Sequence, residues 1–284
     1  MGEKEVLLTA KNAVSAKAVS AKAAEISREF ALIDPRDGKA VKTIEAAPLS
    51  DKAAHAENMQ KLVKELAGQY DRPMTPSKIR NGKLEPGQSR VILDEKALLQ
   101  QLMSLPAFDR DIILPITETS PNVTAESLTG ASQKVIGTYR TTFNSTVKGR
   151  SMNIALSANA IDQIVLGPGD RFAFNQTVGE RTPARGYQKA MEIVNKEFVE
   201  GIGGGICQTS STLYNAVAQA GLEIIELHHH SKEVGYVPIN KDATVSWGGY
   251  DFKFMNSKDH PVIIKTMTDL TSGSLQVQII EAVK

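Results

Sequence analysis

The order of the apolar segments in the second half of the chain limits the folds that it can adopt. Residues 210–220 have the spacing of an amphipathic helix, and short apolar segments follow at 243–247, 252–254, 261–267 and 275–280. A Thr-Ser-Gly-Ser turn joins the last two segments, which favours an antiparallel pair of strands. Helices and strands are thus segregated rather than regularly alternated, which favours an α+β fold over a doubly wound sheet.

The length of 284 residues is enough for about two domains. Residues 1–55 contain an Ala- and Lys-rich repeat and then, over 34–50, several loop-forming residues, so we expect an N-terminal helical arm and a linker. Residues 56–130 mix helical and strand patterns and predict a small α+β domain. Residues 131–284 predict a second α+β domain, in which a cysteine-bearing helix packs on a mainly antiparallel sheet.

Local signals in the first predicted domain define a helix, a hairpin and a cap. The helix is predicted by apolar residues at i, i+3, i+4 and i+7, namely Met59, Leu62, Val63 and Leu66. The dipeptide Asn81-Gly82 predicts the turn of a β-hairpin over 79–84. Asp94 is placed to cap the helix that follows.

Charge and cysteine content exclude several classes of function. Lysine and arginine total 33 against 32 aspartate and glutamate, so the net charge of +1 gives no sequence-wide attraction for nucleic acid or an acidic membrane. The single cysteine excludes an intramolecular disulfide and a CxxC site. No apolar run approaches the roughly 18 residues of a membrane span, and the N-terminal sequence lacks the apolar core of a signal peptide. We therefore expect no transmembrane segment and no export signal in this chain.

The segment around Cys207 carries the strongest chemical signal in the sequence. A glycine-rich loop over 201–205 feeds a helix, which puts Cys207 at or just before the first helical turn. Unpaired backbone N–H groups and the helix dipole favour a thiolate at that position and so lower the pKa of the thiol. We expect Cys207 to be a nucleophile, although a lone cysteine can equally be a small buried packing residue.

The same loop supplies candidates for stabilising an oxyanion. Consecutive glycine N–H groups can form a nest around an anion, and the candidates are Gly203, Gly204 and Gly205. The side chain of Gln208, next to the thiol, could add a donor. Ser210 and Ser211 follow as polar residues of the first turn and complete the candidate substrate contacts of this segment.

A general base is expected from the histidine-rich end of a predicted strand over 222–230. Side chains alternate along a strand, so His228 and His230 are expected to face the same way, and we prefer His230 as the base. Asp242 is the preferred residue to orient the imidazole, and Asp251 is the alternative.

Several blocks in the second half of the chain resemble the VanW domain. In chain order they include Pro168-Gly-Asp-x-Phe-x-Phe-Asn175, Val178-Gly, Gly203-Gly-Gly-Ile-Cys-Gln-Thr-Ser-Ser-Thr-Leu-Tyr-Asn-Ala, His228-x-His230-Ser231, Tyr236-Val-Pro and Asp242-Ala-Thr-Val. They span about residues 135–284, and their occurrence in order makes the resemblance specific. Residues 71–125 also resemble the peptidoglycan-binding domain that often precedes VanW domains.

The resemblance implies a bacterial cell-envelope protein that lies outside the cytoplasm and has peptidoglycan stem peptides or glycan as partners. Some VanW-domain proteins are understood to be L,D-transpeptidases that act through the domain's cysteine, which corresponds to Cys207 here. The family's blocks also include Tyr236, which we add as a candidate substrate contact. Together these imply a cysteine acyltransferase of L,D-transpeptidase type that forms a thioacyl intermediate and needs no cofactor.

Two other classes of function are compatible with these residues. A non-catalytic envelope-binding accessory protein of the glycopeptide-resistance type would use the glycine loop and the histidines for structure or recognition. Such a protein can bury its cysteine, whereas an enzyme needs an accessible Cys207 of low pKa. A metal-dependent hydrolase would use His228 and His230 as ligands, but the sequence offers no clear third and fourth ligand, and we expect no metal.

Overall fold

The computed structural model describes residues 29–45, 52–104, 110–194 and 197–284, which form two compact units. Unit 1 comprises the described parts of Met1–Leu66 and Asp94–Pro115, and unit 2 comprises those of Ala67–Leu93 and Ile116–Lys284. The Ala- and Lys-rich repeat that predicts the N-terminal helical arm lies within residues 1–28, outside the described residues. The domain boundaries after residues 55 and 130 rest on sequence patterns alone and stay a prediction.

Unit 1 is an α+β unit built on a three-stranded sheet of order β2-β1-β6. β1 (Glu29–Ile33) pairs antiparallel with β2 (Ala40–Glu45) and parallel with β6 (Asp111–Ile113). The helices of this unit are α1 (Lys52–Tyr70), up to Leu66, and α2 (Glu95–Met103). The four apolar residues that predict α1 are all buried, and Asp94 caps α2 by accepting the Ala97 N–H at 2.9 Å, so both predictions are confirmed.

The prediction of a linker over 34–50 is wrong where β2 lies, because Ala40–Glu45 forms a paired strand. Its loop signals mark the turn of a hairpin between paired strands instead. Gly38 has a φ of 70°, and its N–H donates to the Asp34 carbonyl at 2.9 Å. The strand pattern of β2 is hard to see in the sequence because only Ile44 of its side chains is buried.

Unit 2 is built on a six-stranded sheet in which every neighbouring pair is antiparallel. In sheet order the strands are β4 (Lys83–Glu85), β3 (Ser77–Arg80), β9 (Ile164–Leu166), β15 (Val262–Asp269), β16 (Ser274–Val283) and β8 (Ser132–Thr142). The predicted Asn81-Gly82 turn joins β3 to β4, with φ of 50° and 73° at the two residues. The predicted C-terminal pair is confirmed as β15 and β16.

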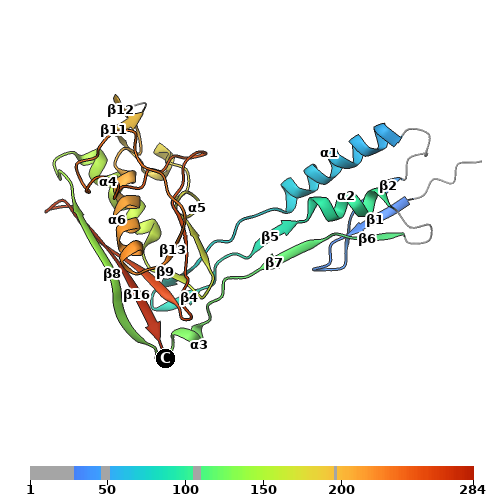
Figure 1. The fold of residues 1–284 in the computed structure, drawn as a ribbon, viewed down its shortest axis with the longest axis horizontal. Helices are drawn as coiled ribbons and strands as arrows, with labels where there is room; N and C mark the ends of the chain where they lie inside the picture. Colours follow the sequence, from blue (N-terminus) through green and yellow to red (C-terminus); the bar gives the residue numbers. More distant parts are fainter. Residues whose placement is uncertain (1–28, 46–51, 105–109, 195–196) are drawn as a thin grey trace, which may run out of the picture. The chain divides into compact units, whose positions relative to one another are not determined.

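Two helices, α4 (Lys148–Ile161) and α6 (Ile206–Gln219), pack on this sheet, and α6 runs along β8 and β16 (Figure 1). Leu213, Ala216 and Val217 of α6 are fully buried in the core. The cysteine-bearing helix therefore packs on an antiparallel sheet, and the α+β class is confirmed. No helix among the described residues combines the length and the apolar character of a membrane span.

Unit 2 also contains a second sheet, a hairpin and several short elements. β10 (Arg171–Ala173), β14 (Lys253–Met255) and β13 (Glu223–Glu226) form an antiparallel sheet of order β10-β14-β13. β11 (Lys189–Val194) and β12 (Glu197–Ile202) form a hairpin that leads into α6. The other elements are β5 (Arg90–Leu93), β7 (Ile116–Thr119), α3 (Ala125–Leu128), α5 (Phe174–Val178) and the 3-10 helix Pro183–Arg185.

Two strands predicted near the histidines differ in the structure. The strand predicted over 222–230 ends at Glu226, after a register shift against β14. The strand predicted over 243–247 is irregular, because side-chain hydroxyl groups of α6, rather than a neighbouring strand, bond the N–H and carbonyl of Ala243. The segment that carries the histidines and Asp242 is therefore a long loop between β13 and β14.

Candidate active site

α6 begins with a glycine turn that places Cys207 in the first helical turn. Gly203 and Gly205 have φ of 100° and 108°, which residues with a Cβ rarely adopt. Between them, a Cβ on Gly204 would lie 2.6 Å from two carbonyl oxygens of β11. Each of the three glycines thus has its own steric requirement, and the turn delivers the thiol beside the β11–β12 hairpin.

The N-terminal end of α6 presents free backbone donors next to the thiol. Within the described residues, the N–H groups of Gly204, Gly205 and Cys207 make no hydrogen bond, whereas that of Gly203 donates to the Gln188 carbonyl at 3.1 Å. These residues line a pocket of about 1040 Å³. Unpaired N–H groups and the positive end of the helix dipole both favour an anion there.

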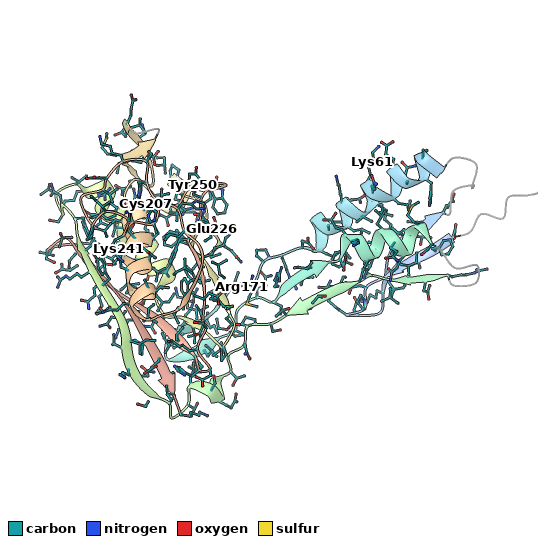
Figure 2. All side chains as sticks on the ribbon, in the orientation of Figure 1. Lys61, Arg171, Cys207, Glu226, Lys241 and Tyr250 are labelled. Carbon is teal, nitrogen blue, oxygen red and sulfur yellow. The ribbon has the colours of Figure 1, made fainter. Side chains whose placement is uncertain are left out.

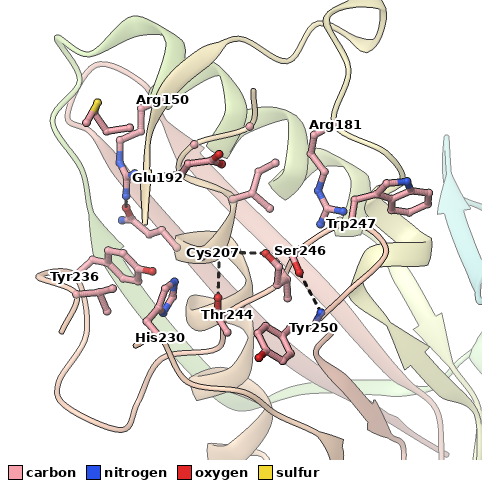
Figure 3. A pocket seen from close by; sticks show the side chains of 18 of the residues that line it. Arg150, Arg181, Glu192, Cys207, His230, Tyr236, Thr244, Ser246, Trp247 and Tyr250 are labelled. Atoms are coloured by element: carbon pink, nitrogen blue, oxygen red, sulfur yellow. Dashed lines mark hydrogen bonds between the residues drawn. The ribbon is translucent and has the colours of Figure 1, made fainter. Parts of the chain in front are cut away.

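Cys207 is partly exposed and opens into this pocket. Figure 2 shows it at the N-terminal end of α6. In Figure 3, Tyr236 and His230 lie on one side of Cys207, and Arg181 and Trp247 lie on the other. The thiol can therefore be approached from the pocket between these two groups of side chains.

His230 lies on the loop after β13, so the strand alternation expected for His228 and His230 does not apply. The His230 side chain is 7 % exposed, and its Nδ1 lies 2.6 Å from Oδ2 of Asp242. The same carboxylate oxygen accepts the backbone N–H of His230 at 2.6 Å. Because Nδ1 is engaged by Asp242, Nε2 is the ring nitrogen that remains for the thiol.

The pKa values of these three groups are shifted towards an ion pair. Burial alone raises the pKa of Cys207, but interactions with the side chain and charge of His230, the Val245 backbone and the Thr244 hydroxyl together outweigh burial and lower it. Burial lowers the pKa of His230, but its interactions with Cys207 and Asp242 raise it overall. The pKa of Asp242 is lowered, since hydrogen bonds from His230 outweigh burial. The geometry therefore favours a thiolate and an imidazolium that a carboxylate orients.

The three consecutive histidines have different surroundings. His228 lies outside the described lining of the pocket, where its Nε2 is 3.1 Å from Oε1 of Glu226 and its ring packs on Tyr250 at 4.5 Å between centroids. His229 lines the pocket and is 42 % exposed. Of the two predicted bases, the structure brings His230 to the thiol and leaves His228 away from it.

Asp251, the alternative orienting residue, is committed to the backbone. Its Oδ1 accepts the N–H groups of Asn175 and Phe252, each at 2.8 Å. The structure therefore brings together Cys207, His230 and Asp242 from the sequence-predicted set and leaves Asp251 outside the group.

Gln208 borders the pocket, but its amide donors point towards β8. Its side chain is almost fully buried, and Nε2 donates to Oγ1 of Thr141 at 3.0 Å and to the carbonyl of Thr142 at 2.9 Å. Its Oε1 accepts a hydrogen bond from Nη2 of Arg150 at 2.8 Å. This side chain is thus used to anchor α6 and Arg150, and the expected donation to an oxyanion would have to come from backbone N–H groups.

Ser210 and Ser211 are fully buried and bind the histidine loop to α6. The hydroxyl of Ser210 donates to the carbonyl of Ala243 at 2.5 Å, and the hydroxyl of Ser211 accepts the N–H of Ala243 at 2.9 Å. Ser211 also donates to the Cys207 carbonyl at 2.7 Å. Both serines therefore hold the residue that follows Asp242, and they are placed to position the acid rather than to touch a ligand.

Tyr236 lines the pocket as expected, and two arginines that sequence reasoning missed line it too. The Arg150 guanidinium lies 5.9 Å from the centre of the Tyr236 ring. Burial raises the pKa of Tyr236, so the phenol stays neutral. Arg181 lies 5.9 Å from the ring centre of Trp247. No motif or spacing in the sequence marks Arg150 or Arg181 as a residue of the pocket.

The described residues contain no group of three or more histidine, cysteine, aspartate or glutamate side chains that could hold a metal ion. The histidines that the metal-hydrolase alternative would use as ligands are instead paired with carboxylates: His228 with Glu226 and His230 with Asp242.

Comparison with known proteins places the pocket in a recognised domain. Residues 149–280 match the family described as VanW like protein. The Bacillus subtilis protein named "Uncharacterized protein YoaR" is 42 % identical over 212 residues, which cover 74 % of this chain and 70 % of that protein. The Enterococcus faecalis protein named "Vancomycin B-type resistance protein VanW" is 27 % identical over 121 residues, covering 39 % of this chain and 42 % of that protein. No solved structure matches the chain.

Proposed function

The chain belongs to the VanW-like family, and from that premise we propose that it is a cysteine acyltransferase of L,D-transpeptidase type acting on peptidoglycan stem peptides. One observation carries the proposal. Cys207 lies at the N-terminal end of α6, and His230 and Asp242 are arranged with it as a base and an orienting acid are arranged with a nucleophile. Cys207 is a partly exposed residue that lines the pocket, and its pKa is lowered, as nucleophilic catalysis requires.

Acylation begins when the Cys207 thiolate attacks the carbonyl carbon of a donor residue and forms a C–S bond. The carbonyl oxygen becomes an oxyanion, which the free N–H groups of Gly204, Gly205 and Cys207 are placed to receive. One such donor contributes on the order of 3 kcal/mol to the transition state. The C–N bond then breaks, and the His230 imidazolium gives its proton to the leaving amine, which leaves a thioester and a neutral imidazole.

Deacylation reverses these roles on a different amine. An acceptor amine attacks the thioester carbonyl while neutral His230 takes its proton, and the C–S bond breaks to regenerate the thiolate and the imidazolium. The product is a new amide, which is a cross-link when the acceptor belongs to a second stem peptide. With water in place of the amine, the product is a shortened peptide with a free carboxylate.

The substrate and the location follow from the family rather than from the geometry. The relative named as a vancomycin resistance protein supports a role at the cell wall, where peptidoglycan lies outside the membrane. We therefore propose that this chain acts outside the cytoplasm. The segment over 71–125, which resembles a peptidoglycan-binding domain, would supply a further contact to glycan or peptide.

The test is incubation of the purified protein with isolated tetrapeptide and pentapeptide muropeptides, beside Cys207→Ala, with products read by mass spectrometry. A dimer, or loss of one terminal residue, that disappears in Cys207→Ala supports the enzyme and identifies its donor. Because Cys207 is the single cysteine, an acyl adduct seen by intact mass belongs to it. No product, together with equal muropeptide binding by both proteins, would favour the non-catalytic binding protein.

A further inference from the structure

Arg181 is a charged residue of the pocket that the proposed acyl transfer does not use. It follows α5 and lines the same cavity as the thiol, on the side of Cys207 opposite His230 (Figure 3). One edge of its guanidinium is fixed, because Nη2 donates to Oδ1 of Asn175 at 2.6 Å. Asn175 is held in turn, since its side-chain amide donates to the carbonyls of Ser246 and Tyr250.

One nitrogen of the Arg181 guanidinium, Nη1, has no partner among the described residues. Nη1 is buried, and no acceptor among the described residues lies within hydrogen-bond distance of it. A buried donor of a charged group that lacks an acceptor is destabilising, and native proteins contain few of them. Arg181 lines the pocket although Nη1 itself is covered, so a ligand that supplies the missing acceptor reaches Nη1 by displacing a covering side chain.

Two aromatic rings and the glycine turn pack around the Arg181 side chain. The Phe174 and Trp247 rings lie 6.0 and 5.9 Å from its central carbon. A Cβ on Gly203 would come within 3.1 Å of the Arg181 Cβ and Cγ, so the glycine turn lets the stem of this side chain pass. Arg181 is thus fixed against the same turn that presents Cys207, and its distance from the thiol is set by the fold.

Arg150, which also lines the pocket, differs from Arg181 in its hydrogen bonding. Its Nη2 donates to Oε1 of Gln208 at 2.8 Å, and none of its side-chain nitrogens is among the buried atoms without a partner. Glu180, Glu192 and Glu233 also line the pocket, but within the described residues none of them supplies an acceptor to Nη1 of Arg181. Of these two arginines, Arg181 is the one with a buried nitrogen, Nη1, that lacks an acceptor among the described residues.

We propose that Arg181 is a carboxylate-binding residue of this pocket, and that it fixes a free carboxylate of the donor stem peptide so that the scissile carbonyl meets Cys207. The inference rests on the proposed function for the identity of the substrate. The fork of a guanidinium suits a carboxylate, and Nη1 donates to it while Nη2 stays on Asn175. The carboxylate is either the C-terminal one or that on the side chain of the stem's diamino acid.

Binding can be measured without chemistry in the Cys207→Ala chain. Trp247 is the single tryptophan, so its fluorescence reports on ligands that reach Arg181. The probes are a synthetic N-acetylated stem tetrapeptide, its C-terminal amide, and its side-chain amide. The proteins are Cys207→Ala alone and with Arg181→Gln or Arg181→Lys, and the control is Arg171→Gln, which changes an exposed arginine of β10 (Figure 2).

The free tetrapeptide should bind roughly 10- to 100-fold more weakly to Arg181→Gln than to the parent or to Arg171→Gln. Arg181→Lys, which keeps the charge but not the fork, should fall between them. One of the two amides should bind weakly to the parent and lose nothing further in Arg181→Gln, which identifies the carboxylate that Arg181 contacts. This comparison of ligands on the parent holds even where a variant fails to fold.

The inference is overturned if both amides bind the parent as well as the free tetrapeptide does, if Arg181→Gln binds all three probes like the parent, or if the free tetrapeptide leaves the fluorescence unchanged. Its failure is distinct from failure of the proposed function. Carboxylate-dependent binding without any Cys207-dependent product would retain the subsite and reject the enzyme. A Cys207-dependent product with unchanged KM in Arg181→Gln would retain the enzyme and reject the subsite.

Discussion

The two sides of the Cys207 pocket are built in different ways. The thiol side is regular structure, in which a glycine turn with two positive φ angles leads into α6 and the helix itself fixes the direction of the side chain. The His230 side is a loop without strand pairing, from the end of β13 to the start of β14. The nucleophile is therefore held by backbone geometry, whereas the base is held by side-chain hydrogen bonds.

The loop side depends on contacts that are individually weak. Asp242 accepts from the His230 backbone and faces its ring, and Ser210 and Ser211 bond the next residue to α6. Asn215 adds a hydrogen bond from Nδ2 to the Lys241 carbonyl at 2.7 Å. Each neutral hydrogen bond contributes about 1 kcal/mol, so single changes in this loop should displace His230 without unfolding the core.

Among substitutions in the histidine loop, His230→Ala should reduce product formation the most. Product formation should fall roughly 10²- to 10⁴-fold, because the thiolate loses its base and its proton donor. The pKa of Cys207 should rise, since the interaction with His230 is the largest of the causes that lower it. The pH dependence of Cys207 alkylation by iodoacetamide measures this shift, and an unchanged alkylation profile would contradict the pairing of the two residues.

Asp242→Asn should cause a smaller loss, of about 10- to 100-fold in product formation. The reason is that a hydrogen bond to a charged group is worth about 1.5–3 kcal/mol, and the asparagine can still accept the His230 backbone N–H. Steady-state rates on muropeptides measure the effect, with circular dichroism to verify the fold. A loss as large as that of His230→Ala, in a folded protein, would mean that Asp242 does more than orient the ring.

The rate of acylation should have a bell-shaped dependence on pH. The thiolate is present above the pKa of Cys207, which lies below its ordinary value, and the imidazolium is present below the pKa of His230, which lies above its ordinary value. Outside that window the rate should change about tenfold per pH unit. In Asp242→Asn the alkaline limb should move to lower pH, because Asp242 raises the pKa of His230. An alkaline limb that stays in place would remove Asp242 from the ion pair.

The helix side of this comparison could be predicted from the sequence because its signals are local. A run of glycines before a segment of helical periodicity places Cys207 at a helix start, just as Asn81-Gly82 marks a hairpin and Asp94 a cap. Each signal acts over a few residues, so no knowledge of the distant fold is needed. Asp242 and Asp251 are both candidates to orient the imidazole, and the structure brings Asp242 to His230.

The loop side and the arginines could not be predicted because their geometry depends on distant partners. The apolar residues at 222–227 suggested a strand through His230, but buried hydroxyl groups of α6 satisfy the loop's backbone after β13 ends. From the sequence, Ser210 and Ser211 are interpreted as polar residues of the first helical turn. Arg181 reaches the pocket only because Asn175 and the Gly203 turn fix its side chain, and no spacing pattern reveals that contact.

Ser211→Ala tests whether α6 holds the loop. The N–H of Ala243 would lose its acceptor, and an unsatisfied buried donor costs about 1–3 kcal/mol of unfolding free energy. Product formation should fall only a few-fold, because Asp242 keeps its own bonds to His230. Urea denaturation measures the stability change, and Ser132→Ala, at an exposed position of β8, is the matched control. Equal stability of the two variants would contradict the anchoring role.

His228→Asn should have the smallest effect, which makes it the sharpest control for His230. His228 is bonded to Glu226 and packed on Tyr250, outside the described lining of the pocket, and Glu226 keeps its ion pair with Lys253 at 2.8 Å when the imidazole is removed. Product formation should stay within about twofold of the parent, as expected for a change of about 0.5 kcal/mol or less. Muropeptide rates for His228→Asn and His230→Asn, measured side by side, give the answer. A loss at His228 as large as that at His230 would mean that the loop rearranges to bring His228 to the thiol, which would reverse the assignment of the base.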